Sequence, residues 1–534
     1  MPAAGTTRPG AKERRYTMVE PAGQADEVDE GNEDARLRGR GLVLSTRVQV
    51  SGHMFFARRA VLAMTRRRVR MEAEPGRRQS MALLAGVTLT AVLCLGALFW
   101  SLVRPAGSAG QARILADQNS GALYVRVGDK LYPALNLSSA RLIAGEPVNP
   151  DRVRRSEIDS HPRGPLVGIP GAPQDMSPTS PGRSSWLVCD EITKAFGASA
   201  PEPVTVTVID GQPDLGQRRH VLGPGDAMVR RYGDAVWLIR DGRRSLIDQS
   251  ARAVLLALGL GEDAVSAARP MSRALFDAIP VGPQLSVPTI PEAGSPARFA
   301  GAPGPVGMVV STPQVGGQTA YSVVLGDGMQ PVSPVVAQVL QNAGPVGAAV
   351  PVVAGPVLAK LPAVEVLDLS AFPPVPPNVV DSQLNSAACW HWETVSGESM
   401  AMTSVIAGPT IPVADSQVDK VVELVRSPGP GLQADRVYLG PDYANYAVST
   451  GNSPSSSTQE SLWWISESGA RFGVPREDDT LRALGLKGHR PSPAPWLALR
   501  LLAPGPVLSR ADALVRHNTL PVDANPAQLE VPKS

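Results

Sequence analysis

The run QSMALLAGVTLTAVLCLGALFWSLV occupies residues 79–103 and contains no charged side chain, although Arg78 and Arg104 flank it. A helix needs about 20 apolar residues to cross ~30 Å of hydrocarbon, and this run is longer than that. A helix in a soluble core would carry a polar stripe, and a signal peptide would lie at the N-terminus with an apolar run of only about 7–15 residues. We therefore predict a single transmembrane helix over residues 79–103.

Arginines are concentrated before this helix. Basic residues next to a membrane span favour its cytoplasmic side. The first basic residues after the span are Arg104 and Arg113. The segment before it contains Arg58, Arg59, Arg66, Arg67, Arg68, Arg70, Arg77 and Arg78. This asymmetry predicts a cytoplasmic N-terminus and places residues 104–520 outside the cytoplasm.

Two kinds of sequence precede the span. Residues 1–44 have few large apolar side chains, which predicts a disordered cytoplasmic tail, and residues 521–534 are predicted to be a disordered tail as well. Residues 45–78 alternate apolar side chains with arginines, which predicts a basic amphipathic helix that is broken at Pro75 and Gly76. This helix either lies on the inner leaflet or packs on a helix of another protein; a simple positive-inside signal is the alternative. The residues predicted to contact the membrane or a partner are Phe55, Phe56, Arg58, Arg59, Arg66 and Arg67.

The part after the span has the composition of a folded, loop-rich α+β domain. The chain contains 51 Gly and 52 Pro, above average usage, and a hydrophobic fraction of 43%. Four segments share one pattern, in which an aromatic-rich strand, a Gly or Asp turn and a second strand precede a helix. A hairpin with one helix cannot bury its own apolar face, so each unit needs a partner surface. The units lie near residues 122–143, 235–260, 320–344 and 461–486.

The order of these units indicates an internal duplication. Cys189 follows the first unit and Cys389 follows the third unit at nearly the same distance. A β-rich stretch comes after each cysteine, VTVTVID from Val204 and VVELV from Val421, and another unit follows. We predict an elongated extracytoplasmic domain in which the four repeat units surround a central β-rich domain with quasi-two-fold symmetry. Chance similarity among short hairpins is the alternative.

The chain contains three cysteines. Cys94 lies inside the predicted span, whereas Cys189 and Cys389 lie in the part predicted to be outside the cytoplasm, where disulfides persist. Their equivalent positions in the two halves favour a disulfide, which would close a loop of about 200 residues. Two buried thiols that never meet are the alternative.

Sequence signatures of catalysis are missing from the chain. None of its lysines follows a glycine, so the phosphate-binding pattern G-x-x-x-x-G-K-[ST] does not occur. The six histidines show no H-E-x-x-H spacing, and no G-x-S-x-G nucleophile elbow is present. His391 lies between two tryptophans, where a half-buried strand residue is a commoner role than a catalyst. The sequence therefore predicts no catalytic, cofactor-binding or metal-binding residue, and its arginines lack the patterns typical of nucleic-acid binding.

Several segments taken together resemble the EccB family of type VII (ESX) secretion membrane proteins, most closely the ESX-3 type. They are FFARRAVLAMTRRRVRM before the span, LVRPAG after it, and then ALYVRVGDKLYPALNLSSARLI, GIPGAP, WLVCD and PWLALRLLAPGPVLSRADAL. The resemblance covers the chain from about Ser45 to His517. It implies a single-pass protein of the bacterial inner membrane whose periplasmic domain has four repeats around a central β-domain. It also implies a disulfide that maps to Cys189 and Cys389.

The resemblance further implies a structural core subunit of the ESX secretion complex, assembled with EccC, EccD and EccE and without nucleic acid. Family members carry the label ATPase, so a membrane-anchored ATPase is one alternative, and ATP enters as a cofactor only through that label. A peptidoglycan-binding anchor, with the cell wall as its partner, is the other alternative. Because the phosphate-binding loop is missing, we expect a structural or binding protein rather than an enzyme.

Overall fold

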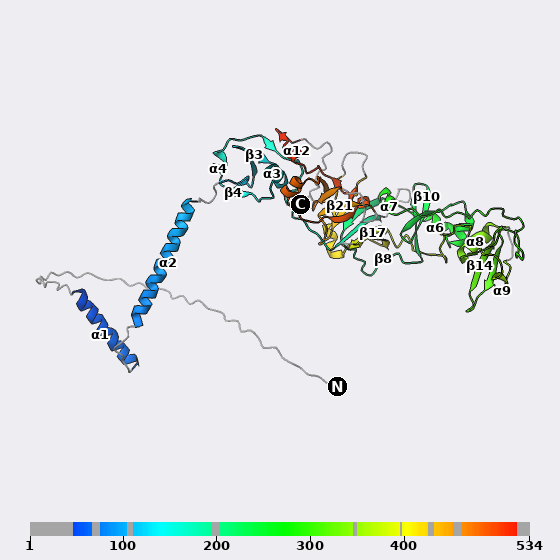
Figure 1. The fold of residues 1–534 in the computed structure, drawn as a ribbon, viewed down its shortest axis with the longest axis horizontal. Coiled ribbons are helices and arrows are strands. Elements are labelled where there is room, and N and C mark those ends of the chain that lie inside the picture. The colour runs from blue at the N-terminus through cyan, green and yellow to red at the C-terminus, as the bar shows by residue number, and fades with distance from the viewer. Residues whose placement is uncertain are drawn as a thin grey trace, which may run out of the picture. The chain divides into compact units, whose positions relative to one another are not determined.

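The chain divides into two compact units, Met1–Phe99 and Trp100–Ser534 (Figure 1). A computed structural model of the 534-residue chain describes residues 46–66, 75–103, 110–193, 203–344, 350–395, 398–425, 432–451 and 461–520. The tails predicted over residues 1–44 and 521–534 lie outside the described residues.

Two helices precede the β-rich part of the chain, α1 (Arg47–Arg66) and α2 (Pro75–Val103). The basic helix predicted over residues 45–78 corresponds to α1 as far as Arg66, and Pro75, predicted to break the helix, is the first residue of α2. Proline is well tolerated at the start of a helix, since the first N–H groups have no partner within the helix anyway. Residues 67–74, including the predicted contact residue Arg67, lie outside the described residues.

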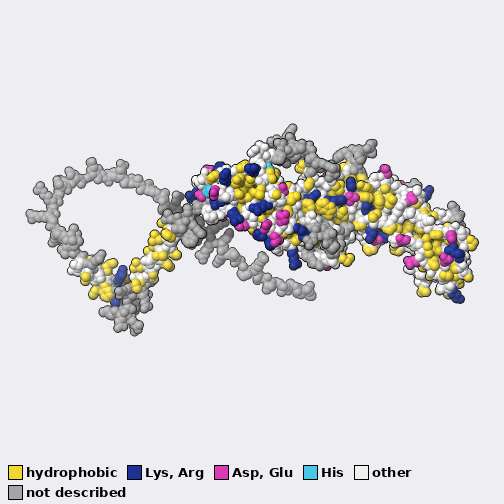
Figure 2. All heavy atoms as spheres, turned by 45° about the horizontal axis from the view of Figure 1, so that its top comes forward, with side chains coloured by type: hydrophobic (Ala, Val, Ile, Leu, Met, Phe, Trp, Pro, Cys, Tyr) yellow, Lys and Arg dark blue, Asp and Glu magenta, His cyan; other side chains and the backbone are white. Residues whose placement is uncertain are grey.

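Among the described residues, α2 is the one helix that is long and apolar enough to cross a membrane. The candidate span covers Ser80–Phe99, and no part of it is buried within the protein. Hydrophobic side chains run along its surface (Figure 2). Thr88 does not interrupt this surface, because its hydroxyl donates to the carbonyl oxygen of Leu84 at 2.8 Å. The helix predicted over residues 79–103 is thus present, and it ends at the predicted residue.

A seven-stranded sheet joins the two halves of the second unit. Its strands follow the order β19-β20-β7-β6-β17-β18-β8, and only the contact between β20 and β7 is parallel. The strands are β19 (Val422–Glu423), β20 (Arg436–Leu439), β7 (Val204–Asp210), β6 (Arg183–Ile192), β17 (Ala387–Val395), β18 (Met402–Gly408) and β8 (His220–Val221).

Four smaller sheets contain the four segments predicted as hairpins with a helix. The first has the order β26 (Arg516–His517), β5 (Leu166–Val167), β3 (Lys130–Ala134), β2 (Leu123–Val127), β1 (Ile114–Asp117) and β4 (Asp151–Val153). The second contains β11 (Arg243–Leu246), β10 (Ala235–Arg240), β9 (Asp226–Tyr232) and β12 (Arg269–Pro270), with β16 (Asn378–Val379) also paired to β9. The third contains β13 (Val309–Pro313), β14 (Thr319–Val324) and β15 (Met329–Val332). The fourth contains β24 (Ser492–Pro495), β21 (Tyr446–Thr450), β22 (Leu462–Ile465), β23 (Ala470–Val474) and β25 (Ala503–Pro504).

Each of these hairpins is followed by a helix. The four helices are α3 (Leu137–Ala144), α5 (Arg252–Ala257), α8 (Pro334–Ala343) and α10 (Asp478–Ala483). The remaining short helices are α4 (Arg155–Asp159), α6 (Glu262–Ser266), α7 (Arg273–Ala278), α9 (Gly355–Leu358), the 3₁₀ helix η1 (Asp415–Lys420), α11 (Trp496–Leu499) and α12 (Arg510–Ala513). In the second hairpin, Asp241 and Gly242 both have positive φ (49° and 70°), as a two-residue type I′ turn requires.

The hairpin–helix segments bury their apolar faces in pairs. The first packs against the fourth, where α3 contacts α10 and the two sheets share one hydrophobic cluster. The second packs against the third in the same way, through α5 and α8. These pairings supply the partner surface that a single hairpin with one helix lacks.

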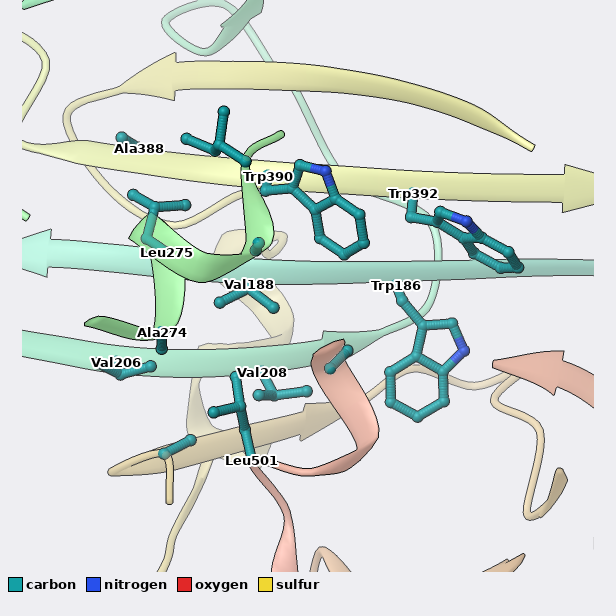
Figure 3. Close-up of a cluster of buried hydrophobic side chains, with 14 of the residues drawn as sticks. Trp186, Val188, Val206, Val208, Ala274, Leu275, Ala388, Trp390, Trp392 and Leu501 are labelled. Carbon is teal, nitrogen blue, oxygen red and sulfur yellow. The ribbon is translucent and has the colours of Figure 1, made fainter. Parts of the chain in front are cut away.

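The largest buried cluster lies on one face of the seven-stranded sheet. Trp186 on β6 and Trp390 and Trp392 on β17 are all fully buried there (Figure 3). Leu275 of α7 covers this face, and Leu501, which follows α11, packs on it from another segment (Figure 3). Buried aromatic side chains of this size dominate the energetics of a core.

The opposite face of the same sheet carries the disulfide. Cys189 and Cys389 face each other in the pairing of β6 with β17 and are bonded, with leucine and isoleucine side chains around them. The stretch VVELV was predicted to be the counterpart of β7, but it forms only the two-residue edge strand β19. The strand that follows β17 is β18, whose Thr, Ser and Ala residues weaken its apolar signal in the sequence.

Replacing Cys189 and Cys389 together by serine is expected to destabilise the second unit. The bond links residues 200 positions apart, for which the loop-entropy model gives at most about 5 kcal/mol. Thermal unfolding of the full chain in detergent, followed by tryptophan fluorescence, measures the change. The Cys94→Ser variant is the control and should unfold like wild type, whereas equal stability of all three proteins would contradict the expected role of the bond.

Candidate functional site

His391 of β17 in the central sheet lies within a group of hydrogen-bonded side chains. Its ring Nε2 lies 3.0 Å from the hydroxyl of Ser185, and its Nδ1 lies 3.3 Å from the hydroxyl of Ser404. The Ser185 hydroxyl also lies 2.9 Å from the carbonyl oxygen of Gly211, to which it donates. Its proton is therefore directed at the backbone, and its oxygen accepts from the imidazole.

This arrangement holds a strand junction together and does not activate a nucleophile. A serine nucleophile needs its proton directed at the base, whereas Ser185 donates to a carbonyl. Burial lowers the pKa of His391, so the ring stays neutral and keeps one donor and one acceptor. The sequence predicts a half-buried strand residue at His391, and the structure places it in β17, 8% exposed.

A buried carboxyl group connects the sheet to α7. Asp190 of β6 accepts hydrogen bonds from the backbone N–H and the hydroxyl of Ser272, at 2.6 and 2.5 Å. Ser272 is the N-cap of α7 and accepts the N–H of Leu275 at 3.1 Å. Burial raises the pKa of Asp190 to about 6, against the opposing effects of the Ser272 hydrogen bonds and the Arg230 charge. Asp190 was not predicted as a functional residue, although a carboxylate within the apolar strand WLVCD was a visible signal.

A cavity of about 1020 Å³ lies at the end of the central sheet, beyond the carboxyl ends of the parallel strands β7 and β20. Residues 179–183, 210–212 and 440–443 line it. Two glycines meet there, because a Cβ atom on Gly211 would lie only 3.2 Å from the Cα atom of Gly440. Asp210 is among the lining residues and is 2% exposed. No motif in the sequence indicated this site.

Five of the six predicted membrane or partner contact residues lie on α1. Phe55 and Phe56 are 44% and 78% exposed, and Arg58 is exposed beside them. The guanidinium of Arg59 lies 4.8 Å from the ring centre of Phe55, a cation–π contact. Arg66 is the last residue of α1. Within the described residues, no group of three or more His, Cys, Asp or Glu side chains is arranged to hold a metal ion.

Sequence comparison identifies related proteins over nearly the whole chain. A family model described as "Type VII secretion system ESX-1, transport TM domain B" matches residues 42–522. The ESX-5 secretion system ATPase EccB5 of Mycobacterium tuberculosis is 57% identical over 496 residues, which are 93% of this chain and 98% of the relative. The ESX-3 secretion system ATPase EccB3 of the same organism is 41% identical over 513 residues, covering 93% and 94%. The expected likeness to the ESX-3 type is thus corrected, because the ESX-5 relative is more similar.

Chains in solved structures of ESX complexes are also similar to this chain. A chain in the structure of an intact ESX-5 inner membrane complex aligns with a TM-score of 0.75 at 56% identity, covering 92% of this chain and 100% of that one. The structure of an EccB3 dimer from the ESX-3 core complex aligns with a TM-score of 0.66 at 38% identity, covering 76% and 100%.

Asp190 is expected to make the stability of the second unit depend on pH. Its pKa of about 6 in the folded chain exceeds the usual 3.8, so the folded state holds the proton more tightly than the unfolded state. The free energy of unfolding should therefore fall as the pH rises from about 4 to about 6, by about 3 kcal/mol from this group.

Denaturant unfolding of the full chain at several pH values tests this expectation. The Asp190→Asn variant should lose this fall in the free energy of unfolding with rising pH. The control variant Asp263→Asn, at an exposed position, should retain it. Parallel pH profiles for wild type and Asp190→Asn would contradict it.

Proposed function

Because the chain belongs to the EccB family of type VII secretion proteins, we propose that it is a structural core subunit of an ESX inner-membrane complex. The observation that carries the proposal is the alignment of 92% of the chain with a chain of the ESX-5 inner membrane complex. Its partners are then EccC-, EccD- and EccE-like subunits and the membrane.

The proposed topology has one span, with the N-terminus in the cytoplasm and the β-rich unit outside it. The arginines before Ser80 support this orientation, because basic residues favour the cytoplasmic side. The disulfide between Cys189 and Cys389 supports the placement of the second unit, because disulfides persist in oxidising compartments.

The second unit is proposed to be an internal duplication with four repeats and quasi-two-fold symmetry. An axis through the Cys189–Cys389 bond would exchange β6 with β17 and β7 with β18. It would also exchange the first segment with the third and the second with the fourth. The observed packing fits this exchange, because the pair of the first and fourth segments would map onto the pair of the third and second.

The alternative functions fit the chain less well. The relatives are called ATPases, but the sequence lacks a phosphate-binding lysine loop, and the Ser185–His391 pair is a structural contact. A peptidoglycan-binding anchor remains a separate candidate, which predicts that the purified protein sediments with insoluble cell wall without other subunits.

Native sizing of the full chain tests the proposal. After mild-detergent extraction through a C-terminal tag, we expect the chain to elute at very large mass with a multi-span protein and an ATPase, both identified by mass spectrometry. An unrelated single-span protein with the same tag is the control. A stable monomer would refute the core-subunit proposal, and ATP hydrolysis by the isolated chain that a point substitution abolishes would favour the enzyme.

α1 is proposed to contact the membrane or a partner helix through its exposed aromatic and basic side chains. Burying a phenylalanine side chain contributes about 1.5–3 kcal/mol. Replacing Phe55 and Phe56 together by serine should therefore lower co-purification of partner subunits at least tenfold, while the span in α2 still holds the chain in the membrane. Gln49→Ser on the same helix is the matched control. Unchanged assembly of the double variant would exclude a partner-binding role for these two side chains of α1.

A further inference from the structure

Arg471 of β23 lies over two tryptophan side chains at the surface of the fourth segment. Its guanidinium carbon lies 5.0 Å from the ring centre of Trp463 and 5.3 Å from that of Trp496, and the two indoles are stacked with their centres 5.6 Å apart. Cation–π contacts hold a guanidinium in place, but they leave its N–H groups without acceptors. Among the described residues, no hydrogen bond or ion pair satisfies these groups, and the Nε atom is buried without a partner. A ligand with paired acceptors and a negative charge would supply what Arg471 lacks.

The second segment contains the same arrangement around Arg244 of β11. Arg244 and Arg471 are each paired with an isoleucine of the preceding strand, and the backbone carbonyl oxygen of each accepts the N–H of a glycine, Gly282 or Gly505, at 2.8 Å. The guanidinium carbon of Arg244 also lies over a tryptophan, 5.5 Å from the ring centre of Trp237. These shared contacts make Arg244 the counterpart of Arg471, so the surroundings of the two side chains can be compared.

The two arginines differ in the negative charge near them. Nη1 of Arg244 donates to the carbonyl oxygen of Ile279, and although burial lowers the pKa of Arg244, the carboxylate of Asp277 opposes this effect. Counted back from the paired glycine of each segment, the place of Asp277 is occupied in the fourth segment by Arg500. Burial lowers the pKa of Arg471 as well, but no carboxylate in the described part of the chain opposes it. The fourth segment therefore lacks the anion that the second segment takes from its own chain.

Exposed apolar side chains lie beside the charged group. Trp496 is 40% exposed, and Val507 is 49% exposed. Gly473 lies between Val507 and Trp463, since a Cβ atom on this glycine would lie 3.5 Å from the valine side chain and 3.9 Å from the indole. A small anion would pair with the arginine and leave this apolar surface in water, whereas a protein surface would cover both. Tryptophan and arginine are also among the residue types that contribute most binding energy at protein interfaces.

We infer that Arg471, Trp463 and Trp496 form a docking surface for an acidic side chain of a partner protein. The partner's carboxylate would form a charge-assisted pair with two N–H groups of the Arg471 guanidinium. Neighbouring residues of the partner would cover Trp496 and Val507. Such a surface exists in a single chain as well as in a large complex, so it can be tested apart from the proposed function.

Binding of a model compound to the full chain in lipid nanodiscs tests this surface without any partner protein. The probe is acetyl-glutamate-amide, and acetyl-glutamine-amide is its uncharged match. Saturation-transfer NMR should give a signal for the glutamate probe that is at least about fivefold stronger than for the glutamine probe, because only a carboxylate forms the charge-assisted pair. Added salt should weaken the glutamate signal, because the arginine is partly exposed.

Variants of Arg471 and of a nearby arginine identify the group that binds the probe. Arg471→Gln should weaken glutamate binding about tenfold, since it removes the charge. Arg471→Lys keeps the charge without the paired N–H groups and should recover only part of this loss. Arg482→Gln is the matched control, because its side chain is 50% exposed in the same segment, and it should bind the probe like wild type.

Recovery of the complex measures the docking of a protein rather than of a small molecule. In native sizing after mild-detergent extraction, Arg471→Glu should reduce the amount of co-eluting partner protein more than Arg471→Gln, because it places a like charge opposite the partner's carboxylate. Trp496→Leu should also reduce it while Arg471 keeps its charge, and Arg482→Glu should leave it unchanged. A chain that elutes as a monomer but binds the glutamate probe refutes the proposed function and supports the carboxylate site.

Four results would overturn the inference. They are equal signals from the two probes, glutamate binding that Arg471→Gln leaves unchanged, full recovery of the complex with Arg471→Glu, and a stronger signal from N-acetylglucosamine oligomers, which would make the two tryptophans a glycan-binding platform. If Arg471→Gln fails to fold, as thermal unfolding followed by tryptophan fluorescence would show, Trp496→Leu decides. Trp496 is exposed, so its truncation leaves the core intact, and glutamate binding should still fall at least about threefold because one ring that holds the guanidinium is lost.

Discussion

The antiparallel pairing of β6 with β17 is the contact on which the rest of the second unit depends. It joins strands 200 residues apart at the bonded pair Cys189 and Cys389. One face of the pair carries the buried tryptophans, and the other carries the disulfide. The contacts around this pairing join residues that are far apart in the sequence. The chain must therefore close large loops before these contacts stabilise the fold.

The two halves are interlocked around that pairing. β8 precedes the second hairpin–helix segment but pairs with β18, and β20 precedes the fourth segment but pairs with β7. Arg500 at the end of α11 extends the link, because its guanidinium lies 2.9 Å from the carboxylate of Asp277 in α7. Neither half can therefore complete its sheet or its covering helices alone, and we expect the second unit to unfold as one cooperative body.

The sequence predicted the local elements well and their partners poorly. The apolar run before Arg104 and the turn at Asp241 and Gly242 carry strong local signals, and the helix and hairpin lie where they were expected. β18 was missed because small polar residues such as Thr403 and Ser404 reduce its alternation. The cavity at Asp210 could not be predicted, because it forms where two strands more than 200 residues apart come together. Sequence periodicity carries no information about such a meeting point.

Asp190 explains why the paired strands β6 and β17 of the central sheet differ. Asp190 and Trp390 occupy corresponding places, each one residue after a bonded cysteine and on the same face. Trp390 fills the core, whereas Asp190 uses both carboxyl oxygens to hold Ser272 at the start of α7. An apolar side chain at position 190 would avoid the cost of burying a carboxyl group, but it would leave the position of α7 fixed only by packing. A directional contact on β6 and a large apolar side chain on β17 thus give the two paired strands different tasks, and the buried carboxyl group of Asp190 fixes where the covering helix begins.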